Sequence, residues 1–220
     1  MLTIEEAVEA RHSVRQYLDK PLADEATEAL QRKIDTINHA TGLHLQLVRN
    51  EPNAFNSFLA HYGKFTGVSN YIALVGGKDA AEACGYYGEQ LVLQAQAHGL
   101  NTCWVGLTFA IATNAFQIDK GEKLHAIISV GYGQTQGVAH KSKTYDEVAT
   151  ATTPVPDWFR KGVACAPLAP TAINHQKFHF TLEGEQVKAT AGWGAFTDMD
   201  LGIAKYHFEI GSGKGHEIWV

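Results

Sequence analysis

The sequence predicts a mixed fold of helices and strands, either α+β or α/β, on three observations. A helix with a capping signal stands near the start, at residues 4–11. The middle of the chain alternates a compact apolar strand at 71–75, a long helix, and β-branched or aromatic-rich runs at 102–105 and 126–130. Near the end, residues 178–190 alternate polar and apolar side chains around a turn, as a β-hairpin does.

The first two helices are predicted from capping and spacing. Thr3 and Glu6 form a T-x-x-E capping box, in which each side chain bonds to the backbone N–H of the other residue, so a helix is expected over 4–11. A second helix is expected from residue 23 to near residue 38, because apolar residues recur there at helical spacing. These residues are Ala26, Leu30 and Ile34.

The next elements alternate between strand and helix. Residues 44–48 alternate polar and apolar side chains, which predicts a half-buried strand. The apolar run at 71–75 predicts a buried strand that two glycines close. Asp79 is expected to cap a long central helix that ends at Gly99.

The last third of the chain is expected to be built differently. Thr, Ala and Pro dominate residues 149–157, where we expect a linker or a long crossover. A hairpin follows, with strands at 178–182 and 186–190. Residues 200–208 have helical character.

Composition excludes several classes of protein. Hydrophobic residues make up 45% of the 220 residues and charged residues 19%, which is typical of a globular chain with a core. The net charge of −5 argues against a surface that binds nucleic acid through its phosphates. No apolar run approaches the length of a membrane span, and the N-terminus is acidic where a signal peptide would be basic. We therefore expect a cytoplasmic protein with no membrane or nucleic-acid partner.

Cysteine and histidine spacing argues against disulfides and metal ions. Cys84, Cys103 and Cys165 are odd in number, widely spaced and in apolar surroundings, so we expect reduced thiols. The 11 histidines include no H-E-x-x-H motif and no pair at ligand spacing with carboxylate support. No metal ligand is predicted.

The strongest candidate for anion binding lies at the end of the first predicted helix. Arg11 and Arg15 flank Ser13, so two guanidinium groups and a hydroxyl could bind a phosphate. Taken alone, a solvated helix end is the simpler explanation, because Arg at a helix C-terminus interacts favourably with the helix dipole.

Three lysines strengthen the case for an anionic ligand. Lys141 and Lys143 follow a Gly-rich turn after a predicted strand, and they could supply two more cations to the same phosphate. Lys64 precedes the strand at 71–75 and could place a cation against a ligand that becomes anionic. Each of them alone would count as a surface lysine.

In this order, these residues resemble the FMN-dependent nitroreductases, a family of flavin oxidoreductases, over much of residues 1–150. The run R-H-S-V-R at 11–15 resembles the family's N-terminal phosphate and flavin motif, and residues 85–100 resemble its central helix. Residues 101–106 resemble the strand and turn that pass beneath flavin N5. The K-S-K run at 141–143 resembles the basic tail that clamps the FMN phosphate.

One family motif is displaced in this sequence. The family places a P-S-x-x-N-x-Q-P-W segment soon after its second helix, but residues 38–42 contain no such pattern. A similar segment occurs at 169–178, where Pro170, Thr171 and Asn174 keep the spacing of the Pro, hydroxyl and Asn positions. The chain therefore resembles a divergent branch of the nitroreductases.

The resemblance implies an α+β nitroreductase-like fold, a mixed sheet flanked by helices, with FMN as the cofactor. NAD(P)H would reduce the flavin and a nitroaromatic or quinone-like acceptor would reoxidise it in a ping-pong cycle, with no catalytic side chain. Arg15 and Lys64 would lie at the flavin pyrimidine edge, and a backbone N–H of Val105 or Gly106 would face N5. The expected cofactor-binding residues are Arg11, His12, Ser13, Arg15, Lys64, Val105, Gly106, Lys141, Lys143, Pro170, Thr171 and Asn174.

The displaced motif also predicts the domain organisation. In the typical family dimer, this segment of one subunit completes the flavin site of the other. We therefore expect residues 1–150 to form the main half and residues 151–220 a reduced second half, an intrachain pseudo-dimer. Residues 200–208 resemble the start of the central helix, which agrees with a second copy. An unrelated C-terminal extension and a homodimer are the alternatives.

Two other functions are compatible with the same residues. One is a non-catalytic FMN-binding or sensor protein, and the other is a different FMN chemistry on this fold, such as dehalogenation or peptide-ring oxidation. Phe109 and Phe116 follow the N5 turn and could stack on a planar acceptor, although core packing is the better explanation for both.

Overall fold

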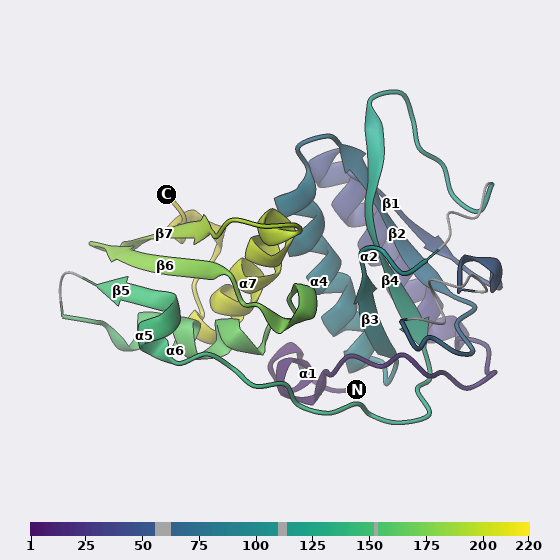
Figure 1. The fold of residues 1–220 in the computed structure, drawn as a ribbon, viewed down its shortest axis with the longest axis horizontal. Coiled ribbons are helices and arrows are strands. Elements are labelled where there is room, and N and C mark those ends of the chain that lie inside the picture. The colour runs from purple at the N-terminus through teal and green to yellow at the C-terminus, as the bar shows by residue number, and fades with distance from the viewer. Residues whose placement is uncertain (56–62, 110–113, 152–153) are drawn as a thin grey trace. The chain divides into compact units, whose positions relative to one another are not determined.

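The computed structural model describes residues 1–55, 63–109, 114–151 and 154–220 and contains two compact units. Unit 1 comprises Met1–Ala80 and Gln90–Ala139, and unit 2 comprises Ala81–Glu89 and His140–Val220. Helix α4 (Ala81–Ala97) therefore gives its first half to unit 2 and its second half to unit 1. The described residues combine helices with two sheets, which confirms the mixed fold class (Figure 1).

Unit 1 is built on a four-stranded antiparallel sheet with the order β1-β2-β4-β3. The central strand β2 is buried over residues 71–76, as its uninterrupted apolar run predicts. Strand β4 begins four residues earlier than expected, because its first residues pair with the end of β2. The strands are β1 (His44–Val48), β2 (Tyr71–Gly77), β3 (Asn101–Val105) and β4 (Glu122–Gly131).

The helices of unit 1 follow their sequence signals. The capping box of Thr3 and Glu6 is present and starts α1 (Ile4–Ala10). Helix α2 (Asp24–Thr41) packs against β1 (Figure 1) and ends at Gly42, whose φ of 71° suits glycine. A short 3-10 turn, η1 (Asn53–Phe55), follows β1. The buried face of α2 consists of Ala26, Leu30, Ile34 and Ile37.

The predicted cap of the central helix is wrong. Ala80, and not Asp79, is the N-cap of α4, and no side chain caps this end. Residues 77–80 form a turn in which the N–H of Ala80 donates to the carbonyl of Gly77, so Asp79 belongs to the turn before the helix. Residues 91–93 and Ala95 are fully buried, as expected for a central helix.

Unit 2 contains a three-stranded sheet in which β5 pairs parallel to β6 and β6 pairs antiparallel to β7. The predicted hairpin is confirmed, with Glu183 opposite Gln186 at its turn. The linker expected at 149–157 is wrong for its first three residues, because they form β5, where buried Ala149 pairs with Phe180. The strands are β5 (Ala149–Ala151), β6 (Phe178–Glu183) and β7 (Gln186–Ala191).

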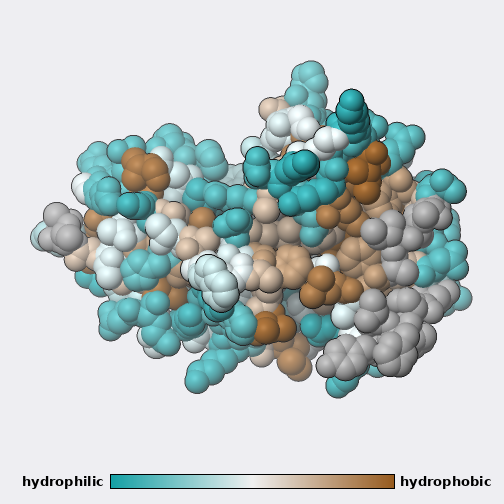
Figure 2. Space-filling model, turned by 45° about the horizontal axis from the view of Figure 1, so that its top comes forward, coloured by the Kyte–Doolittle hydropathy of each residue, from teal (hydrophilic) through white to brown (hydrophobic). Residues whose placement is uncertain are grey.

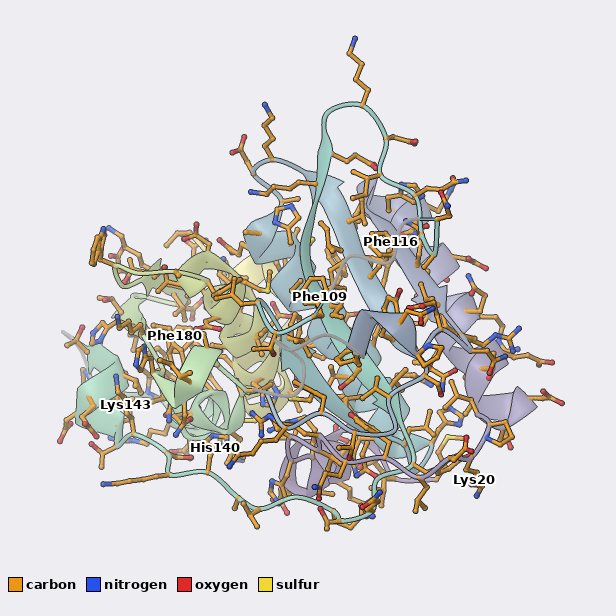
Figure 3. All side chains as sticks on the ribbon, turned by 45° about the vertical axis from the view of Figure 1, so that its right-hand side comes forward. Lys20, Phe109, Phe116, His140, Lys143 and Phe180 are labelled. Atoms are coloured by element: carbon orange, nitrogen blue, oxygen red, sulfur yellow. The ribbon has the colours of Figure 1, made fainter. Side chains whose placement is uncertain are left out.

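The helices of unit 2 pack around aromatic side chains. Phe180 and Phe208 lie 4.9 Å apart between ring centroids, and Phe159 lies 5.6 Å from Phe208 (Figure 3 labels Phe180). Helix α7 begins three residues before and ends four residues after its predicted bounds. The helices are α5 (Tyr145–Val148), α6 (Asp157–Cys165) and α7 (Thr197–Ser212), with 3-10 turns η2 (Ala166–Leu168), η3 (Ala172–Asn174) and η4 (His216–Ile218).

Two glycines bring the first half of α4 into close contact with α7. A Cβ on Gly85 would overlap the carbonyl oxygen of Met199, and a Cβ on Gly202 would overlap the carbonyl oxygen of Glu82. In both cases the obstructing residue lies three positions before the glycine of the opposite helix. The crossing is therefore reciprocal, as in a contact between two-fold related helices.

The exposed apolar side chains come from separate parts of the chain, among them Leu107, Val138, Ile173 and Trp193. Figure 2 shows hydrophobic residues in several patches among hydrophilic ones. Among the described residues, no helix has both the length and the apolar character needed to cross a membrane.

Candidate functional site

The R-H-S-V-R run lies in an extended segment that joins three parts of unit 1. The N–H of Val14 donates to the carbonyl of Thr102 in β3, at 3.0 Å. Arg15 accepts at its carbonyl from Thr66, and Tyr17 donates its N–H back to the Thr66 carbonyl. Together these contacts form bridges on both sides of the segment.

This arrangement brings several predicted residues together in unit 1. The guanidinium carbon of exposed Arg15 lies 6.0 Å from the ring centroid of Phe65, the residue after Lys64. Burial raises the pKa of the Cys103 thiol, and Arg15, Ser13 and Arg11 each act to lower it. Residues 11–15 therefore lie beside β3 and beside the segment that carries Lys64.

The end of β3 supplies the other two predicted residues of unit 1. Ser13 forms a bridge with Thr102, three residues before Val105. The side chain of Val105 is buried, and Gly106 follows directly after the strand. The backbone N–H groups of Val105 and Gly106 thus belong to the same unit as Arg11 and Arg15.

Tyr17 fixes the extended segment to the sheet, a role that sequence reasoning missed. Its hydroxyl donates to the carbonyl of Val14 at 2.7 Å and shares a hydrogen bond of 2.8 Å with the hydroxyl of Ser129 in β4. Burial raises the pKa of the Tyr17 hydroxyl well above its ordinary value, so it stays protonated. A buried tyrosine anchored to β4 gives residues 13–17 one defined position.

In unit 2, the structure joins two segments that are far apart in the sequence. The side-chain amide of Asn174 donates to the carbonyl of Lys141 at 2.9 Å, and the side-chain amide of Gln176 donates to the same carbonyl at 2.8 Å. The ammonium of Lys143 donates to the carbonyl of Gln176 at 2.9 Å. The basic segment 141–143 and the displaced motif are therefore direct neighbours.

The predicted residues of unit 2 differ in how far they are exposed to solvent. Lys141 and Asn174 are exposed, Lys143 and Thr171 are half-buried, and Pro170 is buried. Figure 3 shows Lys143 on the chain that leads to α5. Lys143 retains N–H groups beyond the one it donates to the carbonyl, because an ammonium has three.

Left-handed backbone conformations occur at two predicted residues, Lys64 and Asn174, and at two neighbours of Asn174. Lys64 has a φ of 61°, and Ile173, Asn174 and Gln176 have φ values of 45°, 57° and 48°. Such conformations cost about 1–3 kcal/mol each outside glycine and persist only where the surroundings impose them. The segment 170–176 therefore depends on the contacts that fix its shape.

Asp200 in the first turn of α7 makes one of these contacts. Both of its carboxylate oxygens accept from the N–H of Ala172, at 3.0 and 3.1 Å. Burial raises the pKa of Asp200 to about 6, and the hydrogen bond from Ala172 acts against this. The carboxylate fixes the backbone directly before the left-handed residues.

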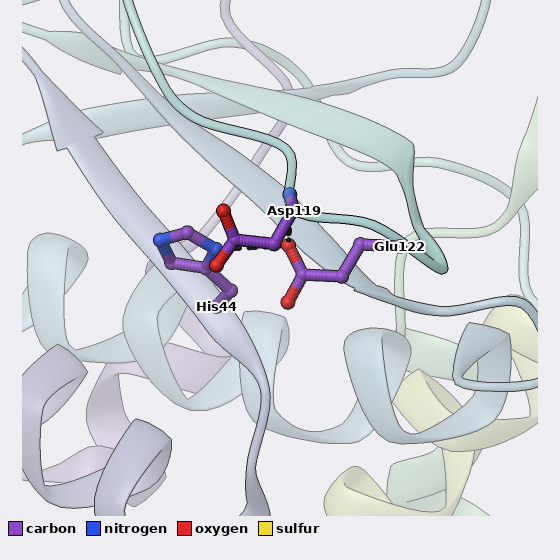
Figure 4. Close-up of side chains that lie close together, drawn as sticks. All are labelled: His44, Asp119 and Glu122. Atoms are coloured by element: carbon purple, nitrogen blue, oxygen red, sulfur yellow. Dashed lines mark hydrogen bonds and ion pairs between the residues drawn. The ribbon is translucent and has the colours of Figure 1, made fainter.

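A group of possible metal ligands occurs at the edge of unit 1. Donor atoms of His44, Asp119 and Glu122 lie within 4.8 Å of one another (Figure 4). One oxygen of Glu122 already accepts from the backbone N–H of Asp119 at 2.8 Å and from Nδ1 of His44 at 2.9 Å. These bonds close the turn before β4 and lower the pKa of Glu122, so they explain the grouping without an ion.

The aromatic residues that follow the turn after β3 pack on the core of unit 1. Phe109 and Phe116 are partly buried against a cluster that includes Tyr17, Tyr71 and Val105 (Figure 3 labels both phenylalanines). Phe116 meets Tyr71 edge to face, at 6.4 Å between centroids.

The sequence profile of the family described as "Putative TM nitroreductase" matches residues 3–212. The chain belongs to this nitroreductase family. No curated relative matches the chain in sequence.

Solved structures share the fold of this nitroreductase family member. A "putative nitroreductase" from Thermotoga maritima MSB8 is 24% identical with a TM-score of 0.66, covering 95% of this chain and 83% of that one. A "putative nitroreductase in complex with FMN" from Desulfovibrio desulfuricans is 19% identical with a TM-score of 0.53, covering 71% and 99%. A "putative NADH dehydrogenase/NAD(P)H nitroreductase" from Bacteroides thetaiotaomicron is 16% identical with a TM-score of 0.51, covering 67% and 96%.

The residues predicted for this nitroreductase family member thus form one group in each unit. Three further residues hold these groups in place and were not predicted, namely Tyr17, Gln176 and Asp200. Gln176 had a signal in the sequence, because it occupies the Gln position of the displaced motif. Tyr17 and Asp200 had none, since their roles depend on contacts with distant segments.

Proposed function

We propose that this chain is an FMN-dependent oxidoreductase that passes electrons from NAD(P)H to a small organic acceptor, nitroaromatic or quinone-like, in a ping-pong cycle. The main supporting observation is the direct hydrogen bonding between the basic segment 141–143 and the displaced motif in unit 2. Two segments assigned to the same cofactor from sequence alone are neighbours in space. The FMN named for the Desulfovibrio desulfuricans structure supports the same cofactor.

The donor set fits the chemistry of FMN. A phosphate monoester carries up to two negative charges and several acceptor oxygens. The chain offers guanidinium, ammonium and hydroxyl donors at the predicted positions, and an exposed ammonium at Lys141. A reduced flavin gains negative charge along its pyrimidine edge, for which cations are the matching groups.

In this proposal, the predicted residues divide by task. Arg11, Ser13, Lys141 and Lys143 bind the phosphate through charge-assisted hydrogen bonds, roughly 1.5–3 kcal/mol each. His12, Pro170, Thr171 and Asn174 complete the cofactor contacts. A larger contribution is expected from Lys141 than from Lys143, because the Lys143 ammonium also serves the carbonyl of Gln176.

Arg15 and Lys64 are proposed to place positive charge at the pyrimidine edge, where they stabilise the reduced form more than the oxidised form. A backbone N–H of Val105 or Gly106 is proposed to donate to N5. Bound FMN supplies the electron transfer itself, so no side chain has to act as an acid or base. A cytoplasmic location, as expected from the sequence, is part of the same proposal.

We propose that residues 1–150 form the main half of the nitroreductase fold and residues 151–220 a reduced second half. The reciprocal contact of Gly85 with α7 and of Gly202 with α4 supports this, because such symmetry is typical of helices related by a two-fold axis. The chain would then act as a monomeric pseudo-dimer. Sedimentation of the FMN-loaded protein tests this against a homodimer.

The enzymatic proposal is tested by loading the protein with FMN and following NADH and NADPH oxidation with nitroaromatic, quinone and ferricyanide acceptors. We expect stoichiometric FMN and turnover with at least one pair of donor and acceptor. FMN uptake without turnover on any pair would favour a non-catalytic flavoprotein. Failure to bind any flavin would remove the proposal altogether.

A further inference from the structure

Gln176 makes more hydrogen bonds than any other described residue of the displaced motif. Its side chain is 2% exposed, and all four of its polar groups are engaged. Its Oε1 accepts from the N–H of Lys143 at 2.9 Å, and its Nε2 donates to the carbonyl of Lys141 at 2.8 Å and to Oδ1 of Asn174 at 2.9 Å. Its own N–H donates to the hydroxyl of Thr171 at 3.0 Å, and its carbonyl accepts from the Lys143 ammonium.

These bonds act on the backbone of both segments at once. One side-chain amide holds the carbonyl of Lys141 and the N–H of Lys143, so it fixes the chain direction from which both ammonium groups project. The bond to Thr171 closes the displaced motif into a loop.

The local backbone shows that this placement is imposed by contacts. Gln176 itself has a left-handed φ of 48°, as do Ile173 and Asn174 nearby. Residues other than glycine adopt this conformation at an energetic cost, which tertiary contacts must offset. The buried amide of Gln176 is the group around which these contacts converge.

We propose that Gln176 is a positioning residue for FMN, which couples the phosphate-binding lysines to the segment that carries Pro170, Thr171 and Asn174. This inference rests on the proposed function. In this role Gln176 touches neither phosphate nor flavin, because its side chain is buried and its polar groups are all hydrogen-bonded within the protein. It acts by holding the 141–143 backbone, so its loss should affect recognition of the phosphate above all.

The experiment compares FMN with riboflavin, which lacks the phosphate. Gln176→Met keeps the length of the side chain and removes both of its hydrogen-bonding atoms. We expect the dissociation constant for FMN to rise about tenfold more than that for riboflavin, since several hydrogen bonds that orient the lysines are lost. Gln176→Asn keeps an amide with a shorter reach and is expected to show the same selective loss to a smaller degree.

A double variant separates positioning from direct binding. If Gln176 acts through Lys143, then Lys143→Met combined with Gln176→Met should weaken FMN by less than the product of the two single effects. Val187→Ala serves as the stability-matched control, because Val187 is fully buried in β7 outside both segments. It should lower the stability of the protein and leave the ratio of FMN to riboflavin affinity unchanged.

Each outcome distinguishes this inference from the proposed function. Equal losses for both flavins, a ratio change as large in Val187→Ala, or full multiplicativity in the double variant would overturn the positioning role while FMN binding by the wild type stands. A wild type that binds no flavin would overturn both. A selective, non-multiplicative loss of FMN supports the inference.

Discussion

Alanine substitutions at Gly85 and Gly202 test how closely α4 approaches α7. A Cβ on Gly202 would lie 2.7 Å from the backbone nitrogen of Tyr86 and 2.9 Å from the carbonyl carbon of Glu82. A Cβ on Gly85 would lie 2.9 Å from the carbonyl carbon of Met199. All of these obstacles are backbone atoms, so no side-chain rotation can relieve the overlap. The two helices would have to move apart.

Two opposing effects set the magnitude. Alanine favours a helix over glycine by about 1 kcal/mol, which alone would stabilise either variant. Overpacking in a closely packed interior costs about 1–3 kcal/mol, and the rigid obstacles place these variants toward the upper end of that range. We therefore expect each single variant to lose about 1–2 kcal/mol of unfolding free energy, despite the gain in helix propensity.

The double variant gives the more specific result. Because the contacts are reciprocal, one outward movement of the helices accommodates both methyl groups. The loss in Gly85→Ala combined with Gly202→Ala should therefore be smaller than the sum of the single losses, by about 0.5 kcal/mol or more. Two unrelated defects would add.

Urea unfolding followed by circular dichroism measures these losses. Gly77→Ala is the matched control, because a Cβ at this exposed strand end meets nothing within 4 Å. Its effect should stay within about 0.5 kcal/mol. Single variants as stable as the wild type, or strictly additive losses in the double variant, would refute the close reciprocal crossing.

The remaining predictions concern the proposed flavin contacts and one buried carboxylate. Lys141→Ala combined with Lys143→Ala should weaken FMN binding far more than riboflavin binding in fluorescence titrations, because riboflavin has no phosphate to lose, and equal losses would contradict the assignment. Lys64→Ala or Arg15→Ala should lower the reduction potential of bound FMN more than either changes the affinity for oxidised FMN. For this two-electron couple, a loss of roughly 1.4 kcal/mol in stabilisation of the reduced form lowers the potential by about 30 mV. Unchanged potentials in both variants would indicate structural roles. The pKa of Asp200 is raised to about 6 from an ordinary value of about 3.9, so its protonated form favours the folded state and stability falls as pH rises from about 4 to about 6. Asp200→Asn removes this titration and should gain at most about 3 kcal/mol relative to wild type between about pH 4 and pH 8, and a stability difference independent of pH would contradict the raised pKa.

Local signals predicted the fold where they were strong. The capping box of Thr3, the apolar run of β2 and the alternation of the β6–β7 hairpin each specify an element within a few residues. Strand β5 has no such signal, because it depends on parallel pairing with β6 about 30 residues later. The N-cap of α4 was misplaced because Asp79 is a good cap by type, while the turn at 77–80 decides the register.

The candidate site divides in the same way. Residue type and motif order identified groups that can bind an anion, such as Arg15 and Lys141, and the structure places them in two groups. The residues that hold these groups were harder to find, because Tyr17 reaches Ser129 and Asp200 reaches Ala172 only in the folded chain. Sequence order carries no information on such pairs.

The division of α4 between the two units has a consequence for the order in which the chain folds during synthesis. Every residue of unit 1 has been synthesised once residue 139 is added, but residues 81–89 belong to a unit whose other members begin at residue 140. Gly202 follows Gly85 by 117 positions, which takes about 6–24 s at the usual rates of translation. During that interval the second half of the helix can join its own core, while the glycine-containing first half waits for α7. The second half of α4 can thus pack first, and its first half can pack only after α7 has been made.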